Sequence, residues 1–484
     1  MKVRATQAIM ECLLEQEVDT VFGYPGGTIL NLYDELYHYQ DKIHHVLTAH
    51  EQGAAHAADG YARSTGKVGV CFATSGPGAT NLTTGIATAY MDSSPVVFIT
   101  CNVSEGLLGK DSFQEVDITG IAMPITKATY LVRDPQTIPD VMRQAFAVAA
   151  TGRPGPVLID FLKNVTFLNT MIDYEFIPWD QNRGTDSIRQ LAVSHGLKAP
   201  EPDLGDIDTL VEMIAQSERP LLICGGGVRY AEAHKVFKKF AEDFGIAFGE
   251  TQAGKSAVVW DHELNLGGLG TTGGIAANKL AHEADVVIGV GTRYTDFTTA
   301  SKWLYRTDAK FVNINPSEFQ AYKMDATPVV ADANEALTAI GEELAKIGYH
   351  TDKAYAEEVA ALRKEWWTEV ERLDAVEYTD KEHFTPEIND ANRECVEKYI
   401  EDTGCKLCQT TVLGTINHLI DDNAIVCAAA GSLPGDMQGL WRARKTNTYH
   451  MEYGYSCMGY EVASALGAKI ACPDQEVYAM CGDG

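Results

Sequence analysis

The stretch HEQGAAHAADGYAR, residues 50–63, places a carboxylate, Glu51, at the head of an alanine-rich segment with helical character. Alanine and glycine recur through this segment, as they do where a helix packs closely against another backbone. Because Glu51 comes soon after the apolar pair Val46-Leu47, we expect it at the edge of a buried seam. A lone first-turn glutamate usually reflects the helix dipole alone, so its role depends on the rest of the chain.

The composition limits the class of protein. A length of 484 residues predicts about three domains. The hydrophobic content of 45% and charged content of 22% are typical of a soluble globular protein. The net charge of −28, without a basic tract, argues against nucleic acid and anionic membranes as partners. We find neither a signal peptide nor an apolar run long enough to span a bilayer, and we expect a cytoplasmic protein.

Short apolar runs bounded by glycine, proline or serine alternate with helical segments along the chain. This alternation predicts an α/β fold of three successive doubly wound parallel-sheet domains, the third truncated. The first predicted strands are residues 18–22, 68–73, 96–101 and 157–161, with helices from Thr6, Glu51 and Asn81. The expected parts are an amino-terminal domain (1–172), a linker (173–204), a central domain (205–348), an acidic helical connector with Trp366-Trp367 as packing anchors (349–404) and a carboxy-terminal domain (405–484).

Cysteine and glycine patterns give weaker signals. Scattered cysteines indicate reduced thiols, and we expect several of the eleven to lie in buried strands: Cys71, Cys101, Cys224, Cys427 and Cys481. Cys405 and Cys408 form an isolated CxxC pair without zinc spacing, so we interpret them as incidental. The run GLGTTG at 268–273 matches GxGxxG, but no β-branched strand leads into it and no acidic residue follows at ribose-binding distance. We therefore expect no dinucleotide site there.

Three segments in order resemble thiamine-diphosphate (ThDP) enzymes: the Glu51 helix, the loop YGYSCMGYE at 453–461 and GDG at 482–484. The resemblance implies that Glu51 is catalytic and bonds the aminopyrimidine of the cofactor. It also implies that Gly482, Asp483 and Gly484 open the magnesium-diphosphate motif, with Asp483 binding Mg²⁺. The further cofactor-binding residues that it implies are Ser75, Gly76, Gly431, Ser432, Leu433, Tyr455 and Met458.

Residues 1–170 resemble the acetohydroxyacid (acetolactate) synthases in particular. The matching segments are GYPGG at 23–27, TSGPGATN at 74–81, FQE at 113–115 and PITK at 124–127. The substrate-channel residues that this resemblance implies are Tyr24, Gly26, Phe113, Gln114 and Lys127.

From about residue 205 the chain is more similar to the trihydroxycyclohexane-1,2-dione hydrolases of inositol catabolism. That similarity rests on ETQAGK at 250–255, GTRYTDFTTASK at 291–302, AGSLPGD at 430–436 and YHMEYGYSCMGYE at 449–461. The central domain lacks the synthase pattern that binds a flavin, so FAD is not expected. The two halves thus point to different substrates.

Our leading hypothesis is a ThDP- and Mg²⁺-dependent hydrolase of C–C bonds that opens a cyclic polyhydroxy 1,2-dione to 5-deoxyglucuronate. One alternative is an acetolactate-synthase-like carboligase acting on pyruvate. Another is an inactive fragment that serves only in binding or oligomerisation.

The resemblance also implies a homodimer or homotetramer whose subunits share each site. Because GDG falls at residues 482–484, we expect a fragment of a longer enzyme. Such a fragment would have an incomplete magnesium shell, an exposed edge at the strand 476–481 and weak binding of ThDP-Mg²⁺. We therefore expect the activity of the full-length enzyme and none from the fragment alone.

Overall fold

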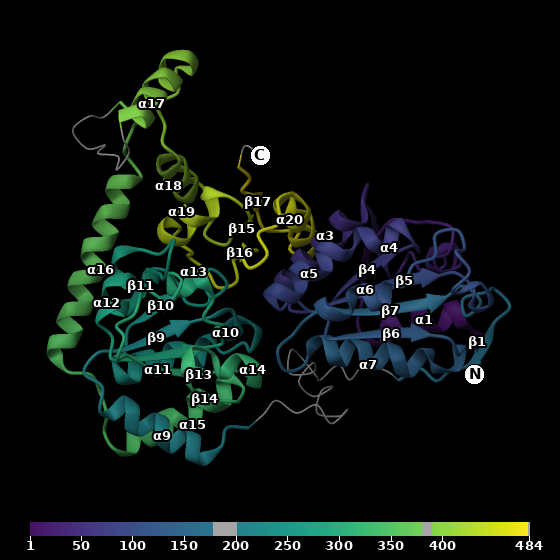
Figure 1. Ribbon diagram of the computed structural model, residues 1–484, viewed down its shortest axis with the longest axis horizontal. Coiled ribbons are helices and arrows are strands. Elements are labelled where there is room, and N and C mark those ends of the chain that lie inside the picture. Colours follow the sequence, from purple (N-terminus) through teal and green to yellow (C-terminus); the bar gives the residue numbers. More distant parts are fainter. Residues whose placement is uncertain (178–200, 380–389, 483–484) are drawn as a thin grey trace. The chain divides into compact units, whose positions relative to one another are not determined.

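The computed structural model describes residues 1–177, 201–379 and 390–482. They form two compact units, each considered by itself (Figure 1). The first unit comprises Met1–Pro200, Ile425–Ala430 and His450–Gly484, and the second comprises Glu201–Ala424 and Gly431–Tyr449. Each contains a six-stranded parallel sheet, which confirms the predicted α/β class.

The sheet of the first unit has the order β3-β2-β4-β5-β7-β6. Its strands are β2 (Thr20–Gly23), β3 (His44–Leu47), β4 (Gly69–Ala73), β5 (Val96–Asn102), β6 (Ala128–Val132) and β7 (Val157–Leu162). Its helices are α1 (Ala5–Glu15), α2 (Leu30–Tyr37), α3 (Glu51–Thr65), α4 (Pro77–Asn81), α5 (Thr83–Asp92), α6 (Ile118–Ala122) and α7 (Ile138–Ala150). A small antiparallel pair joins β1 (Lys2–Arg4) to β8 (Met171–Asp173).

Both faces of this sheet are covered by helices, which explains its almost continuously apolar strands. Successive residues of one strand enter different cores, as Val97 and Phe98 of β5 do. Val97 packs in the core formed with α1, α2 and α7, whereas Phe98 packs in the core formed with α3 to α6. The alternation places α3 and α7 on opposite sides of the sheet (Figure 1).

The first unit also contains the core of a smaller sheet, with the order β16-β15-β17. Its elements are β15 (Ile425–Ala428), β16 (Tyr449–Met451), β17 (Val477–Ala479) and the helix α20 (Tyr460–Ala471). Helix α20 packs tightly on α3, because a Cβ at Gly60 would collide with the Ser464 carbonyl and one at Gly467 with the Ala57 carbonyl. The small residues of α3 therefore serve the close helix packing that the sequence predicts.

The second unit has a sheet of order β11-β10-β9-β12-β13-β14. Its strands are β9 (Pro220–Cys224), β10 (Phe248–Glu250), β11 (Asn265–Gly268), β12 (Val286–Val290), β13 (Lys310–Ile314) and β14 (Thr327–Val329). Its helices are α9 (Leu204–Ala215), α10 (Gly226–Tyr230), α11 (His234–Phe244), α12 (Ile275–Glu283), α13 (Asp296–Thr299), α14 (Glu318–Ala321), α15 (Ala333–Lys346), α16 (Lys353–Leu373), α17 (Asp390–Thr403), α18 (Gln409–Leu419) and α19 (Ser432–Leu440). Trp366 and Trp367 of α16 are buried against this unit, as predicted.

The glycine motif at 268–273 begins at the end of the short strand β11, whose four residues include no β-branched one, as predicted. That strand lies at the edge of the sheet, whereas nucleotides bind at the switch point, here between β9 and β12. The motif's glycines serve packing instead. A Cβ at Gly268 would lie 2.6 Å from the Gln438 carbonyl oxygen, and one at Gly270 would collide with the Phe297 carbonyl.

All the cysteines of the described residues are free thiols, including Cys405 and Cys408. Four of the five expected in buried strands are buried, but Cys481 is exposed because it follows β17 at the edge of its sheet. Within the described ranges, no helix has both the length and the apolar character needed to cross a bilayer.

Candidate active site

Glu51 opens α3 at the carboxyl edge of the first unit's sheet, directly beyond β3. His50 has an extended backbone and caps the helix, since its Nδ1 accepts a hydrogen bond from the Gln52 amide at 3.1 Å. The Glu51 side chain is buried, with 7% of the residue exposed. A parallel strand followed by a helix thus delivers a carboxylate to the edge where α/β proteins place their ligands.

A hydrogen bond from a residue of α4 holds the carboxylate of Glu51 in place. The side-chain amide of Asn81 donates to Glu51 Oε2 at 2.9 Å. A Cβ at Gly78 would lie 3.0 Å from Glu51 Oε1 and 2.7 Å from Thr74 Cγ2, so only glycine leaves the carboxylate in this position. Sequence reasoning expected a helix to begin at Asn81 and gave Asn81 no role. The sequence does contain a signal for this contact, because Asn81 follows β4 and so lies at the same edge of the sheet as Glu51.

The segments after β2 and β4 meet beside this carboxylate. Thr28 Oγ1 accepts from the Ser75 amide at 3.0 Å and donates to the Cys101 carbonyl at 2.5 Å. Gly76 has a φ of +58°, and a Cβ there would lie 2.8 Å from Gln114 Cβ. The structure therefore brings Ser75, Gly76 and Gln114 together. Thr28, which ties these loops, was not predicted from the sequence.

Other predicted substrate residues lie in different surroundings. Gly26 is packed against Thr74, where a Cβ has no room, and the side chains of Tyr24 and Phe113 are exposed. The Lys127 amine donates to the carbonyls of Val148 and Thr151 and so caps the carboxyl end of α7. Burial lowers the pKa of Lys127 to about 8.

The loop between β16 and α20 lies against α3 in the same unit. Gln52 Nε2 and His56 Nε2 both lie 3.5 Å from the thiol of Cys457. Burial lowers the pKa of His56 to about 4, so its ring is neutral at physiological pH. The predicted cofactor residues Tyr455 and Met458 belong to this loop and are exposed. The structure thus places this loop against the first turns of the helix that carries Glu51.

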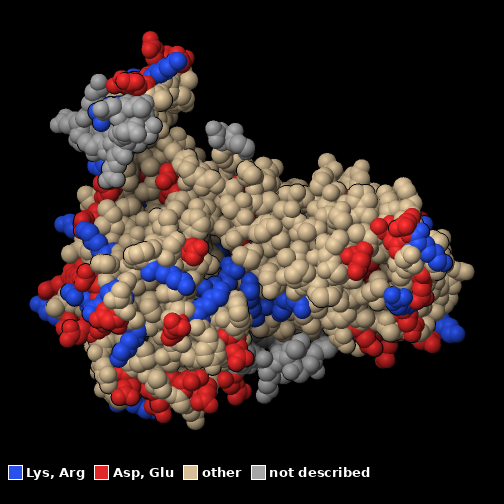
Figure 2. Space-filling model, viewed as in Figure 1, with Lys and Arg blue, Asp and Glu red and all other residues tan. Residues whose placement is uncertain are grey.

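Helix α20 presents an apolar stripe next to this loop. Val462 and Leu466, one helical turn apart on α20, are 64% and 44% exposed, and Met458 of the loop that precedes the helix is 73% exposed. Figure 2 shows few charged side chains over α3 and α20. Contiguous exposed apolar side chains of this kind mark interaction surfaces.

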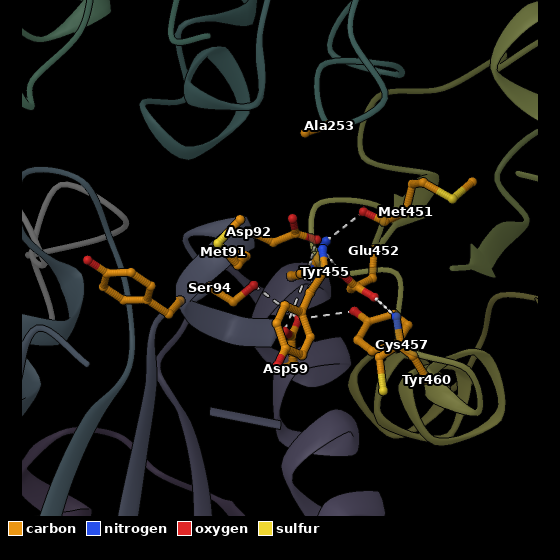
Figure 3. Close-up of polar contacts among 12 residues, drawn as sticks. Asp59, Met91, Asp92, Ser94, Ala253, Met451, Glu452, Tyr455, Cys457 and Tyr460 are labelled. Carbon is orange, nitrogen blue, oxygen red and sulfur yellow. Dashed lines mark hydrogen bonds and ion pairs between the residues drawn. The ribbon is translucent and has the colours of Figure 1, made fainter. Parts of the chain in front are cut away.

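A buried group of charges lies behind the loop (Figure 3). Arg63 of α3 forms ion pairs with Asp59 and with Asp92 of α5, the latter at 2.9 Å. Its guanidinium also donates to the Met451 carbonyl at 3.0 Å, and the Tyr460 hydroxyl donates to Asp59 at 3.1 Å. These contacts link the helix of Glu51 to both ends of the loop.

The remaining predicted residues are distributed over the chain. Gly431, Ser432 and Leu433 lie at the start of α19 in the second unit, where Gly431 has a φ of +94°. Gly482 is exposed beyond β17, whereas Asp483 and Gly484 lie outside the described residues. Within the part of the chain that the structure describes, no group of three or more His, Cys, Asp or Glu side chains could hold a metal ion.

Comparison with known proteins gives matches to three family models along the chain. They are the N-terminal TPP binding domain of thiamine pyrophosphate enzymes (residues 3–121), the central domain (207–340) and the C-terminal TPP binding domain (429–484). The chain belongs to the thiamine pyrophosphate enzyme family. The predicted resemblance to this family is therefore confirmed, and thiamine pyrophosphate is thiamine diphosphate, the expected cofactor.

Curated members of this enzyme family are similar over the whole chain. The 3D-(3,5/4)-trihydroxycyclohexane-1,2-dione hydrolases of Bacillus cereus (strain AH820), Bacillus anthracis (strain A0248) and Bacillus thuringiensis (strain Al Hakam) are each 40% identical over 509 residues. The match covers 100% of this chain and 76% of each relative. It thus includes residues 1–170, where the sequence resembles the synthases.

The described side chains fit a ThDP cofactor on the amino-terminal side. Glu51 is a group that can share a proton with an aminopyrimidine ring nitrogen, and Asn81 holds it in one orientation. Gly78 leaves open the space beside Glu51 Oε1 that any larger residue would fill. The buried carboxylate of Glu51 and the small residue beside it therefore fit such a cofactor.

Proposed function

We propose that the chain is a ThDP-dependent hydrolase that cleaves a C–C bond and opens a cyclic polyhydroxy 1,2-dione. The observation that carries the proposal is the 40% identity to 3D-(3,5/4)-trihydroxycyclohexane-1,2-dione hydrolases over 100% of this chain. The buried Glu51 supports a catalytic role at the cofactor.

In the proposed reaction, water adds to one carbonyl carbon of the dione, and the bond between the two carbonyl carbons breaks. The first carbon becomes a carboxylic acid, which releases one proton to solvent as it becomes a carboxylate, and the second takes up a proton and becomes an aldehyde. The bound ThDP supplies a temporary acceptor for the electron pair of the broken bond. Atoms and charge balance with one water as the only co-reactant.

The protein's own contribution is to hold protons and orient the reacting groups. Glu51 would hold a proton shared with the ring nitrogen of the cofactor, and the 2.9 Å bond from Asn81 keeps its Oε2 in place. Because Glu51 is buried, bulk water does not compete strongly for that proton. Ser75 and Gly76 would contact the cofactor, and Gln114, which packs against Gly76, would line the neighbouring substrate side.

We further propose that Asp483 would hold Mg²⁺, which would neutralise negative charge on the cofactor diphosphate, and that Gly482 and Gly484 would allow close approach of the backbone. Oxygen ligands from a carboxylate and phosphates suit this hard cation. Ser432 and Leu433 at the start of α19, with Tyr455 and Met458, would complete the cofactor contacts.

A homo-oligomer with shared sites is also proposed. The exposed stripe of Met458, Val462 and Leu466 supports it, because such a surface is stabilised by association. Light scattering should show an oligomer that Val462→Glu shifts toward monomer. A wild-type protein that is monomeric and active would contradict shared sites.

The experiment that tests the function offers the cyclic dione and pyruvate together to the purified full-length protein with ThDP and Mg²⁺. Product analysis by NMR should show the ring-opened acid and unchanged pyruvate. Consumption of pyruvate with formation of acetolactate would instead support the synthase alternative.

A further inference from the structure

Glu452 makes an unusual set of contacts just after β16. It is fully buried, and its own amide continues the sheet by donating to the Ala428 carbonyl at 3.0 Å. Its carboxylate accepts from three successive backbone amides. Oε1 accepts from Tyr455 at 2.8 Å and Ser456 at 3.1 Å, and Oε2 accepts from Cys457 at 2.7 Å.

These bonds fix the backbone of a loop whose side chains project outward. Ser456 has a φ of +58°, a left-handed conformation that a serine adopts only when neighbouring contacts favour it. Glu461 holds the far end of the loop by accepting from the Gly459 amide at 3.0 Å. The exposed Tyr455 and Met458 are therefore presented by a backbone held between two carboxylates.

Several titratable side chains from different elements lie near the Glu452 carboxylate (Figure 3). Burial and the neighbouring Asp92 of α5 raise the pKa of Glu452 to about 7, while Arg63 of α3 and the loop amides oppose that rise. Other titratable groups beside it are the Cys457 thiol within the loop, His450 on β16, and the pair of Asp59 and Tyr460 that adjoins Arg63.

We propose that Glu452 is a positioning residue whose carboxylate gathers the amides of residues 455–457 and so sets the loop that presents Tyr455 and Met458 beside the helix of Glu51. The loop contacts the cofactor under the proposed function, so the KM and activity measurements rest on that function. The hydrogen bonding of the Glu452 carboxylate to the amides of residues 455–457, here called the clamp, does not depend on the proposed function. Its loss would disturb the loop in the protein without any cofactor.

The clamp depends on charge. The carboxylate accepts all three amides, whereas the protonated acid carries a hydroxyl hydrogen on one oxygen that must itself find an acceptor. The loop is therefore held above about pH 7 and loosened below it. The effect of pH on the stability of the whole fold has the opposite sign to its effect on the loop. Because the folded pKa is raised, the stabilisation from protonating Glu452 is present below the unfolded value of about 4.5 and is lost as the pH rises through about 7.

Hydrogen exchange measured by mass spectrometry on the protein without cofactor tests the clamp directly. In the wild type, amides 455–457 should exchange roughly tenfold faster at about pH 6 than at about pH 8, after correction for intrinsic rates. Glu452→Gln should exchange at the faster rate at both pH values, because its side-chain NH₂ cannot accept a bond. Glu175→Gln, which changes an exposed carboxylate of the same unit, should match the wild type.

Equal protection in the wild type and Glu452→Gln would overturn the proposal, as would wild-type protection that does not depend on pH. If Glu452→Gln fails to fold, the exchange rates of amides 455–457 in the wild type at the two pH values still test the proposal. The amides of α20 then serve as the internal reference. In the wild-type holoenzyme we expect activity to rise with pH around pH 7, as the loop becomes held; Glu452→Gln should remove this rise and increase the KM for ThDP about tenfold. Glu452→Asp, which keeps the charge, should retain that pH dependence. Absence of ring opening by the wild type would contradict the proposed function while leaving the exchange result intact.

Discussion

The side-chain amide of Asn81 donates a hydrogen bond of 2.9 Å to Glu51, although the two residues lie 30 positions apart in the sequence. The bond joins the end of α4 to the first turn of α3, at the carboxyl edge of the sheet. It gives the carboxylate one orientation and leaves Oε1 beside Gly78, where a larger residue could not fit.

Asn81→Ala removes this donor from a buried carboxylate. We expect turnover to fall about tenfold, because a hydrogen bond to a charged group contributes about 1.5–3 kcal/mol. Steady-state kinetics with saturating ThDP measure the effect. Asn31→Ala, on the partly exposed helix α2, is the matched control and should behave as the wild type. Unchanged kinetics in Asn81→Ala would show that Glu51 does not need this support.

Two glycines of α3 should respond in opposite directions to alanine. Gly53 faces open space, so Gly53→Ala should raise the free energy of unfolding by about 0.5–1 kcal/mol. At Gly60 an added methyl group collides with Ser464 of α20, and Gly60→Ala should lower it by about 1–3 kcal/mol. Chemical denaturation measures both values. Similar effects at the two sites would contradict the close contact of α3 with α20.

Arg63→Ala leaves the carboxylates of Asp59 and Asp92 buried without their cation. We expect a loss of about 3–5 kcal/mol in the free energy of unfolding. Lys67→Ala removes the exposed ion pair with Asp19 and should cost no more than about 1 kcal/mol. If urea denaturation gives equal losses for the two variants, the buried network does not stabilise the fold as described.

Asp160 of β7 should make the stability of the first unit depend on pH. Burial raises its pKa to about 6, while hydrogen bonds from Asn102 and Thr100 oppose the rise. The folded value lies above the unfolded one, so this stabilisation is present below about pH 4 and is lost as the pH rises through 6. Thermal melts should therefore show a stability decrease between pH 4 and 6 in the wild type relative to Asp160→Asn. Parallel pH curves for the two proteins would refute this assignment.

Much of the central architecture could be predicted from the sequence, because buried parallel strands are apolar on both faces. The run beginning at Val96 is one example, and its strand extends to Asn102. Several strands that were not predicted are edge or partly exposed ones, such as β3 with its two histidines. The buried interior strand β10 was also not predicted, and it has only three residues. Strand β3 is stabilised by its pairing with β2, and a strand held by such pairing needs no apolar pattern in its own sequence.

The candidate site was less accessible to sequence reasoning. The glutamate, the glycine-rich loops and the GDG run follow from local pattern and resemblance. The bond from Asn81, the tie through Thr28 and the three amides on Glu452 depend on loops from separate parts of the chain meeting at one place. A polar residue in such a loop has no periodicity that would reveal its partner.

The most direct test of the account compares dione ring opening by the wild type, Glu51→Gln and the exposed control Glu175→Gln, with ThDP and Mg²⁺ present. We predict that Glu51→Gln keeps the circular dichroism spectrum and melting temperature of the wild type but loses at least about a hundredfold in turnover, because its amide cannot exchange a proton with the cofactor ring. Glu175→Gln should remain fully active. Ring opening by Glu51→Gln at the wild-type rate would contradict the account.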